Sequence, residues 1–498
     1  MKNSPVIVGI GQAIDRDSDI EAAPHPLRLG EAAVRACLDD VESNRVLDHI
    51  SAVSVVNILS WSYRDPPGML CEMLCIDPPV KEYTTWGGNS PQWLVNRAAD
   101  RIARNEKEVV LLVGAEAMNT TLKMGKMNFV PQWPVIENTG IPMIGDDRYG
   151  SGPHEVLHRA ETPAQVYPLF ENALRAELGL GIDEHRKFIS DLLANHSKIA
   201  AASPYAWFRN ERCSREIEEV TDKNRMIGFP YTKLMNPILA VNQAAALICT
   251  SAVMADRLSI PKHKRIYIHG GAEAHDRWLV SDRESFTASP AIREVGRAAL
   301  AMAGIRVDSI DFFDIYSCYP SALFVGARSI GLDIRNLPTL SITGGLPYFG
   351  GPGNNYTMHA IAHAVERLRR RPGEYGYVSG LGWYITKHSA GIYSGREPER
   401  PWARNGSDEI QRKIDAAKGP AVSLSPGGTA AVETYTVMHD RRGEPEYAIV
   451  VARLEGGERC WALAPNDRDL FRCMETEEFI GRKGVVTPGN GAANIIRF

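Results

Sequence analysis

The stretch TTWGGNSPQW, Thr84–Trp93, joins an extended segment to a helix through two glycines, an asparagine and a serine. Ser90 stands where an N-cap belongs and Pro91 at the first helical position, and apolar residues then recur at helical spacing. Gly87 and Gly88 permit close backbone approach and unusual dihedral angles. The free N–H groups of a helix that begins here are predicted to face the sheet edge where ligands bind in open α/β folds.

The same order of parts surrounds a second junction, YFGGPGNNY, at 348–356. Short apolar runs begin both units, VIVGIGQ at 6–12 and RIYIHGGAEA at 265–274, and both are predicted to be buried parallel strands. An Ala-rich helix, a strand, the Gly-Gly junction, a second helix and a second strand follow each of them. The pattern predicts two copies of one α/β unit, with helices on both faces of each sheet.

Two segments fall outside this duplication. One is rich in Met, Pro, aromatic and charged residues, as is typical of an insertion that shapes a binding site. The other alternates polar and apolar residues around turn signals, which predicts a small β-barrel-like domain. The predicted organisation is an N-terminal half at 1–118 and 236–262, an insertion at 119–235, a C-terminal half at 263–398, a linker at 399–418 and a β-domain at 419–498.

Composition excludes several classes of protein. The 498 residues are 44% hydrophobic and 23% charged, with a net charge of −4, so the chain is globular and carries no basic excess for nucleic acid. No run of about 18 apolar residues predicts a membrane span, and the N-terminus enters a strand directly without a signal-peptide region. We expect a cytoplasmic protein whose eight scattered cysteines are thiols.

The duplicated unit, NQAAALICTSAVMADRL from Asn242 and VDSIDFFDIYSCYPSALFVGARSIGL from Val307 together resemble the thiolase superfamily. The segment HSKIAAASPYAWF, 196–208, is similar to the sterol-carrier-type thiolases, and the extra β-domain resembles that of thiolase-like proteins of type 1, often labelled acetyl-CoA acetyltransferases. The resemblance covers about residues 5 to 395. It implies a duplicated five-layer αβαβα fold that handles CoA thioesters, and a homodimer formed through the thiolase core.

The departures from the family pattern bear on function. Where the family motif C-x-S-G has its nucleophilic cysteine, this chain has Gly88, while Ser90 matches the serine. Gly351 replaces the histidine of the G-H-P motif, and Gly380 replaces the cysteine of C-x-G. Tyr316 stands where the family has Asn or His, in a segment that keeps the cysteine of the sterol-carrier variant. A chain without the thiolate is not expected to form the usual acyl-enzyme.

The remaining polar groups near these positions are the candidate site. A tyrosine can act as a general acid or base, and hydrogen-bond donors can stabilise an enolate without a covalent step. The candidate catalytic residues are Tyr316, Cys318, His359, Ser90 and Asn89. The candidate substrate-binding residues are Gly87, Gly88, Gly350, Gly351, Asn354, Asn355, Tyr356, Gly380, Gly382 and His388.

These candidates leave several functions open. The leading hypothesis is an acyltransferase or carbon–carbon lyase of lipid metabolism that acts on a CoA thioester without the standard cysteine and histidine. One alternative is retro-aldol cleavage of a β-hydroxyacyl-CoA, because the thiolase-like aldolases of sterol side-chain breakdown resemble this chain in having a tyrosine at the position of Tyr316. Another is a non-catalytic acyl-CoA-binding or partner protein. No cofactor is expected beyond the CoA thioester as substrate, and no nucleic-acid or membrane partner.

Two further motifs indicate other kinds of site. HEVLH fits the zinc-peptidase pattern, with His154 and His158 as ligands, Glu155 as base and Glu177 as a third ligand, so zinc hydrolysis is a remote alternative. GIGQAI follows the first strand but lacks the third glycine of a dinucleotide fingerprint, which excludes NAD. Lys387 and His388 follow a Gly-rich loop and are expected to be solvated.

Overall fold

Two half-sheets with equivalent strands form the body of the chain, whose computed structural model describes residues 3–105, 109–134, 142–335, 339–404 and 407–498. The elements of the first half are β1 (Pro5–Ile14), α1 (Pro26–Asp40), β2 (Ile50–Val55), α2 (Pro66–Leu74), β3 (Val80–Thr84), α3 (Ser90–Ala103), β4 (Val109–Ala117), β8 (Asn242–Ser251) and α9 (Ala252–Arg257). The elements of the second half are β9 (Ile266–His275), α10 (Pro290–Ala303), β10 (Phe312–Asp314), α11 (Pro320–Ser329), α12 (Tyr356–Arg370), β11 (Tyr375–Gly382) and β12 (Lys387–Ser394).

The strand order repeats between the halves. The order β2-β4-β8-β1 in the first half matches β10-β11-β12-β9 in the second. In each half the first pair is parallel and the next two are antiparallel. The half-sheets join through two residue pairs between β1 and β9, which makes one ten-stranded sheet. The duplication predicted from the sequence is therefore confirmed.

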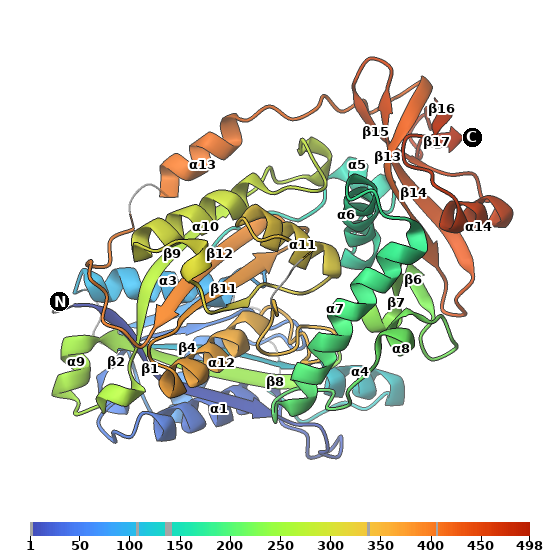
Figure 1. Cartoon of the computed structure of the whole chain (residues 1–498). Helices are drawn as coiled ribbons and strands as arrows, with labels where there is room; N and C mark the ends of the chain where they lie inside the picture. The colour runs from blue at the N-terminus through green and yellow to red at the C-terminus, as the bar shows by residue number, and fades with distance from the viewer. Residues whose placement is uncertain (1–2, 106–108, 135–141, 336–338, 405–406) are drawn as a thin grey trace.

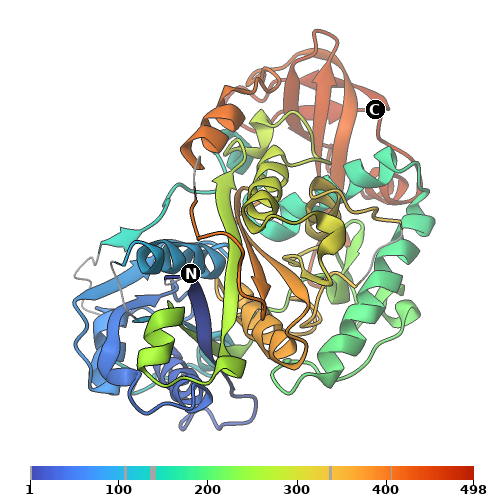
Figure 2. The same ribbon diagram turned by 60° about the vertical axis from the view of Figure 1, so that its left-hand side comes forward.

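Five layers result, because α3 and α12 lie between the two half-sheets and contact strands of both (Figures 1 and 2). The apolar residues of α3 that the sequence predicted to face the core are all buried. Helix α12 is buried around most of its circumference, as a central helix must be. Helix α1 covers the outer face of one half-sheet, and α10 covers that of the other. This is the αβαβα arrangement of a thiolase-like fold.

The direction of the two first strands differs from the prediction. β1 pairs antiparallel with both β8 and β9, and β9 pairs antiparallel with β12. Their continuous apolar runs come from burial on both faces, which an antiparallel strand covered by helices shares with a parallel one. The apolar runs therefore predict that these strands are buried, but they do not indicate whether the strands are parallel or antiparallel to their neighbours.

The insertion supplies further elements to both halves of the body. Its elements are α4 (Met118–Met127), β5 (Met143–Ile144), α5 (Pro153–Leu157), α6 (Pro163–Glu177), α7 (Ile182–Ala202), α8 (Ser214–Glu218), β6 (Met226–Gly228) and β7 (Tyr231–Thr232). The stretch HRKFISDLLANHSKIAAASPYAWF, 185–208, predicts a helix, and α7 covers this stretch only as far as Ala202. Residues 135–141 of the insertion lie outside the described residues. Within the described ranges, no helix combines the length and hydropathy that crossing a membrane requires.

The C-terminal region forms a closed barrel of five strands. Its elements are α13 (Ser407–Ala416), β13 (Gly428–His439), β14 (Pro445–Leu454), β15 (Arg459–Leu463), α14 (Arg468–Thr476), β16 (Lys483–Thr487) and β17 (Ile495–Arg497). The order β14-β15-β17-β16-β13 closes on itself through the β13–β14 pair. Strands β6 and β7 of the insertion extend this sheet from β13, so the barrel shares its sheet with the insertion (Figure 1).

Candidate active site

The two Gly-rich junctions, far apart in the sequence, meet at the N-terminal ends of α3 and α12. The N–H of Gly87 donates to Oδ1 of Asn354 (2.8 Å), and the hydroxyl of Thr357 donates to the carbonyl oxygen of Gly88 (2.8 Å). Gly87 has a φ of +145°, which a residue with a side chain rarely adopts. The duplicated fold thus brings its two equivalent turns into direct contact.

A cavity of about 550 Å³ opens beside these junctions. Aromatic side chains form much of its wall, and no Asp, Glu, Lys, Arg or His stands among the described residues that line it. The aromatic residues are Trp86, Tyr167, Tyr316, Tyr319, Trp383 and Tyr384, and the others include Leu59, Gly87, Gly88, Cys318, Leu346 and Asn354. The pocket has the largely apolar lining, with few convergent polar groups, that is usual for small-molecule sites.

Tyr316 occupies the place of a side chain on residue 88. A Cβ built on Gly88 would collide first with the hydroxyl of Tyr316 and then with the carbonyl oxygen of Leu381 (2.6 Å). The ring packs edge-on against Tyr356, with centroids 5.5 Å apart at 89°. Burial raises the pKa of Tyr316 well above its usual value, so the hydroxyl is a neutral donor at neutral pH.

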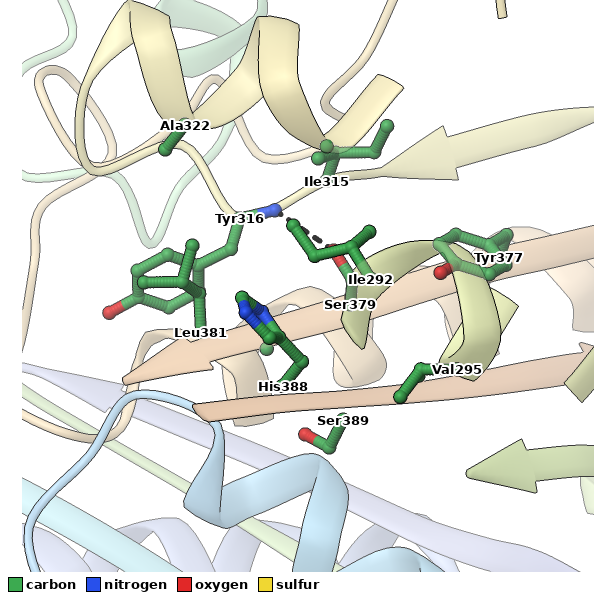
Figure 3. Close-up of a pocket in the computed structure, with 12 residues that line it drawn as sticks. Ile292, Val295, Ile315, Tyr316, Ala322, Tyr377, Ser379, Leu381, His388 and Ser389 are labelled. Atoms are coloured by element: carbon green, nitrogen blue, oxygen red, sulfur yellow. Dashed lines mark hydrogen bonds between the residues drawn. The ribbon is translucent and has the colours of Figure 1, made fainter. Parts of the chain in front are cut away.

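The inner face of Tyr316 borders a second, small cavity of about 20 Å³ (Figure 3). The backbone N–H of Tyr316 donates to Oγ of Ser379 (3.2 Å), which fixes the start of the loop between β10 and α11 against β11. Figure 3 shows the phenol hydroxyl on the side away from Tyr377 and Val295. Tyr316 and Leu381 line both this cavity and the large pocket.

Cys318 lines the large pocket but is a poor nucleophile there. Burial raises the pKa of its thiol to about 12, which keeps the sulfur protonated. Because no base stands among the described pocket-lining residues, no neighbour is placed to take its proton. Tyr167, whose hydroxyl donates to the carbonyl oxygen of Trp383 (2.7 Å), stacks on Tyr319 with centroids 4.5 Å apart.

Three predicted residues of the second junction have structural partners. The hydroxyl of Tyr356 bonds to Oγ1 of Thr343 (2.6 Å) and donates to Oδ1 of Asp314 (3.2 Å), and Tyr356 is not among the described residues that line the large pocket. Burial raises the pKa of Asp314 to about 6. Asn355 donates through Nδ2 to the carbonyl oxygen of Gly114 (2.8 Å). The third, His359, lies deeper still.

His359 is not brought to the pocket. Its Nδ1 donates to Oε1 of Gln12 (2.7 Å), and its ring packs 5.3 Å from that of Phe349. Burial lowers its pKa to about 3. His359 lies on α12, between the half-sheets, where its side chain joins the core.

Asn89, Ser90 and His388 line a different hollow, of about 280 Å³, behind the first junction. The N-cap of α3 is Asn89, one residue before the predicted Ser90, and neither side chain makes a capping bond. Nε2 of His388 donates to Oδ2 of Asp276 (3.1 Å). Asn89, Ser90 and His388 do not line the large pocket.

Lys387 is buried, with 7% of its surface exposed, and so is His388, so the expectation that they are solvated is wrong. Nζ of Lys387 donates to the carbonyl oxygens of Trp86 and Asp146, the latter at 3.1 Å. Burial lowers its pKa to about 8. The ammonium therefore fixes the backbone at the start of the first junction.

The remaining predicted glycines differ in their relation to the pocket. A Cβ on Gly380 would lie 3.0 Å from the carbonyl oxygen of Gly88, so this position adjoins the first junction. Gly382 adjoins it too, next to Asn89. A Cβ on Gly351 would meet Leu346 at 3.2 Å, a pocket-lining residue. Gly350 instead packs against Gln243 on β8.

The HEVLH motif does not form a metal site. Asn494 N–H donates to Nε2 of His158 (3.0 Å), and Nδ1 of His158 donates to the carbonyl oxygen of His154 (2.7 Å). Glu155 accepts from the N–H and hydroxyl of Ser281 (both 2.8 Å). Glu177 is paired with Arg328. No group of three or more His, Cys, Asp or Glu that could hold a metal occurs in the described ranges.

Of the six aromatic residues that line the large pocket, the sequence predicted only Tyr316 as a site residue. Tyr167 lies on α6, in the insertion, and Trp383 and Tyr384 follow β11. Trp86 stands within the first junction and is 43% exposed at the pocket. The run YGYVSGLGW did end in an aromatic residue directly after the predicted strand, a position where ligand contacts gather in α/β folds. No comparable signal marked Tyr167.

Two family models match parts of the chain. A model of the thiolase-like protein type 1 additional C-terminal domain matches residues 409–490, and a model described as thiolase C-terminal domain-like matches residues 272–337. The Ltp2-ChsH2(DUF35) aldolase shares the fold at 18% identity, with a TM-score of 0.60, 80% of this chain and 99% of that chain covered. No curated protein matches the sequence.

A crystal structure of a monomeric SCP2-thiolase like protein type 1 from Mycobacterium smegmatis is similar over the whole chain. The identity is 32% and the TM-score 0.86, covering 100% of this chain and 99% of that one. Because that relative is monomeric, it does not support the homodimer expected here. Its similarity extends through the C-terminal barrel, and the chain belongs to the family of SCP2-thiolase-like proteins of type 1.

Proposed function

We propose that the chain binds the acyl part of a CoA thioester in the large pocket and cleaves a carbon–carbon bond of a β-hydroxyacyl-CoA by a retro-aldol reaction. The observation that carries this proposal is the hydroxyl of Tyr316 in the place of a side chain on Gly88. The resemblance assigns that position to the nucleophilic sulfur. A proton donor therefore stands where a thiolase would hold its acyl group.

A second donor lies beside Tyr316. The N–H of Gly88 makes no hydrogen bond to any other described residue, and Gly88 lines the pocket. A hydroxyl and an amide that converge on a thioester carbonyl oxygen would stabilise the enolate that forms when the bond breaks. The donors are held in place, since Tyr356 packs against the ring and Thr357 fixes the Gly88 carbonyl.

The reaction is balanced without an ionised side chain. The bond between Cα and Cβ breaks, and its electron pair becomes the thioester enolate. The β-hydroxyl gives its proton to a water molecule as the β-carbon becomes a carbonyl. The enolate, held by hydrogen bonds from Tyr316 and the Gly88 N–H, then takes a proton from water at Cα. Because burial disfavours the phenolate, a path in which Tyr316 stays a neutral donor suits this site.

The lining favours an acyl group that is bulky and uncharged. Six aromatic residues surround the cavity, and no charged side chain stands among its described lining residues. Acyl transfer through Cys318 is less suited to this site, because its pKa of about 12 leaves the thiol protonated.

A non-catalytic acyl-CoA-binding protein is the second candidate. It is favoured by the absence of an ordinary base from the described lining, where only hydroxyl and thiol groups with raised pKa values could move a proton. Such a protein would bind the thioester and release it unchanged.

The variant Tyr316→Phe distinguishes the candidates. Incubation with β-hydroxyacyl-CoA thioesters, followed by mass spectrometry of the shortened acyl-CoA and the carbonyl product, measures turnover, and calorimetry measures binding. We expect the variant to lose turnover by about 10²-fold or more with binding retained. The matched control is Tyr377→Phe, whose buried hydroxyl has no partner among the described residues and does not line the pocket. Equal turnover in Tyr316→Phe and the wild type would refute a lyase that depends on this hydroxyl.

A further inference from the structure

The C-terminal barrel contacts helix α6 along one side. The hydroxyl of Thr434 on β13 donates to the carbonyl oxygen of Leu169 (2.5 Å). The other bonds across this interface are Asn172 Nδ2 to the Tyr435 carbonyl oxygen (2.8 Å), Gln165 Nε2 to the Tyr447 hydroxyl (2.7 Å) and Arg175 to Glu478 (2.7 Å). Figure 1 shows β13 and β14 beside α6. These contacts run from the first turn of α6 to its last.

The opposite side of α6 is a wall of the large pocket. Pro163, Ala164 and Tyr167, all in its first turns, line the cavity. Tyr167 stacks on Tyr319 and bonds to the Trp383 carbonyl oxygen, so the position of α6 sets the position of this aromatic pair.

The end of α6 at the pocket lacks one backbone hydrogen bond of the helix, so contacts from the barrel matter more for its position. Pro168 lies inside the helix and has no N–H, so the carbonyl oxygen of Ala164 lacks its usual partner four residues later. The first turn is thus tied less firmly to the rest of the helix. The contact between Gln165 and Tyr447 is made at this turn.

A second connection runs from the barrel to the other side of the aromatic wall. Arg459 on β15 is fully buried, is paired with Glu433 and donates to the carbonyl oxygens of Ser281 (2.9 Å) and Arg283. Arg283 in turn donates to the carbonyl oxygen of Tyr384 (2.6 Å). The rings of Tyr384 and Tyr167 are 6.4 Å apart, so both connections end on neighbouring side chains.

We propose that the C-terminal barrel is a positioning domain for the pocket: it holds the aromatic wall through α6 and through Arg459, and so sets the shape of the acyl site. The inference rests on the proposed function only in taking the large pocket as the site. It assigns Tyr447 and Thr434 as positioning residues that touch no substrate.

The test compares the double variant Tyr447→Phe/Thr434→Val with the wild type. Phenylalanine keeps the ring that lies 4.5 Å from the Arg159 guanidinium and removes only the hydroxyl, and valine matches the shape of threonine. The matched control is Thr487→Val, an exposed threonine of the same barrel whose hydroxyl bonds within the barrel. All proteins carry Cys75→Ser and Cys213→Ser, because these two thiols are exposed.

Two readouts need no substrate: amide hydrogen exchange over residues 163–167, and the rate at which iodoacetamide alkylates Cys318, followed by peptide mass spectrometry. Losing a hydrogen bond of ordinary strength should raise exchange at 163–167 roughly two- to tenfold. Alkylation of Cys318 should accelerate, while the control matches the wild type. Exchange and alkylation that stay at wild-type levels in the double variant would overturn the proposal.

Exchange over β13 and β14 reports whether the barrel itself stays folded. If the double variant opens the barrel, Tyr447→Phe alone decides the matter by the same two readouts, since it removes a single half-buried hydroxyl. These two readouts use no CoA thioester. If the wild type showed no turnover, the proposed function would be refuted, but the exchange and alkylation results would still decide whether the barrel positions the pocket.

Discussion

The hydroxyl of Tyr316 lies against the position that a Cβ on Gly88 would take, so a side chain at residue 88 would collide with this tyrosine. A cysteine at position 88 and a tyrosine at position 316 cannot both fit this backbone. In the function proposed above, hydrogen-bond donation by this hydroxyl takes the place of covalent capture by a sulfur at residue 88.

This exclusion predicts energetic coupling between the two positions. Gly88→Ala should destabilise the protein by about 1–3 kcal/mol, the usual cost of overpacking a buried site. In a Tyr316→Ala background the ring is gone, and the same substitution should cost less by at least about 0.5 kcal/mol, the coupling typical of contacting residues. Urea unfolding of the four proteins measures the cycle. Strictly additive values would show that the two residues do not compete for space.

Cys318→Ala is predicted to retain turnover. The thiol is protonated at neutral pH and no base lies beside it among the described pocket-lining residues, so its removal takes away packing and no chemistry. Steady-state kinetics with the substrate that Tyr316→Phe fails to cleave gives the comparison. A loss as large as that of Tyr316→Phe would assign the sulfur a direct role.

Glu116 is predicted to make stability fall as pH rises. Its carboxylate accepts the N–H groups of Leu59 and Ser60 (both 2.8 Å) at the edge of the pocket, and burial raises its pKa from 4.5 to about 7. Between these two values the folded protein keeps a proton that the unfolded chain releases, so unfolding becomes easier from pH 5 to pH 7.

The variant Glu116→Gln cannot titrate. The free energy of unfolding is measured in urea at intervals from pH 5 to pH 8. In the wild type it should fall by an amount on the order of 1–3 kcal/mol over this range, and in Glu116→Gln this fall should be absent. The readout is the slope, because the amide also changes the bonds to Leu59 and Ser60. Parallel pH profiles for the two proteins would contradict the assignment.

Chelation is predicted to leave the protein unchanged. Both ring nitrogens of His158 are engaged by backbone groups, and Glu155 is held by Ser281, so the HEVLH segment has no ligand set to offer. Melting curves with and without EDTA, together with elemental analysis, check this. Stoichiometric zinc with a melting temperature that drops on chelation would reinstate the metal site.

The body of the fold could be predicted from the sequence because its signals are local. Apolar runs, prolines at the first position of helices and glycine-rich turns recur in the same order in both halves. Each of these signals indicates the secondary structure of the segment in which it stands. The pairing of Gly88 with Tyr316 was also within reach, since both departures fall on motif positions of the family that the chain resembles.

The surroundings of the site could not be predicted in this way. Tyr167 reaches the pocket only because α6 packs between the barrel and the second half, and the burial of Lys387 depends on carbonyl groups distant in sequence. The N-cap of α3 is Asn89 and not the predicted Ser90, and both residues line the hollow behind the junction and not the large pocket. Such outcomes depend on contacts between remote segments, which periodicity does not encode.

A crystal structure of the Tyr316→Phe variant with a bound β-hydroxyacyl-CoA, compared with the wild type bound to a non-cleavable thioester analogue, tests the central claim most directly. We expect the acyl group in the large pocket in both, with the thioester oxygen of the analogue about 2.6–3.2 Å from the Tyr316 hydroxyl. An acyl group bound in the hollow behind the first junction, or a carbonyl turned away from Tyr316, would contradict it.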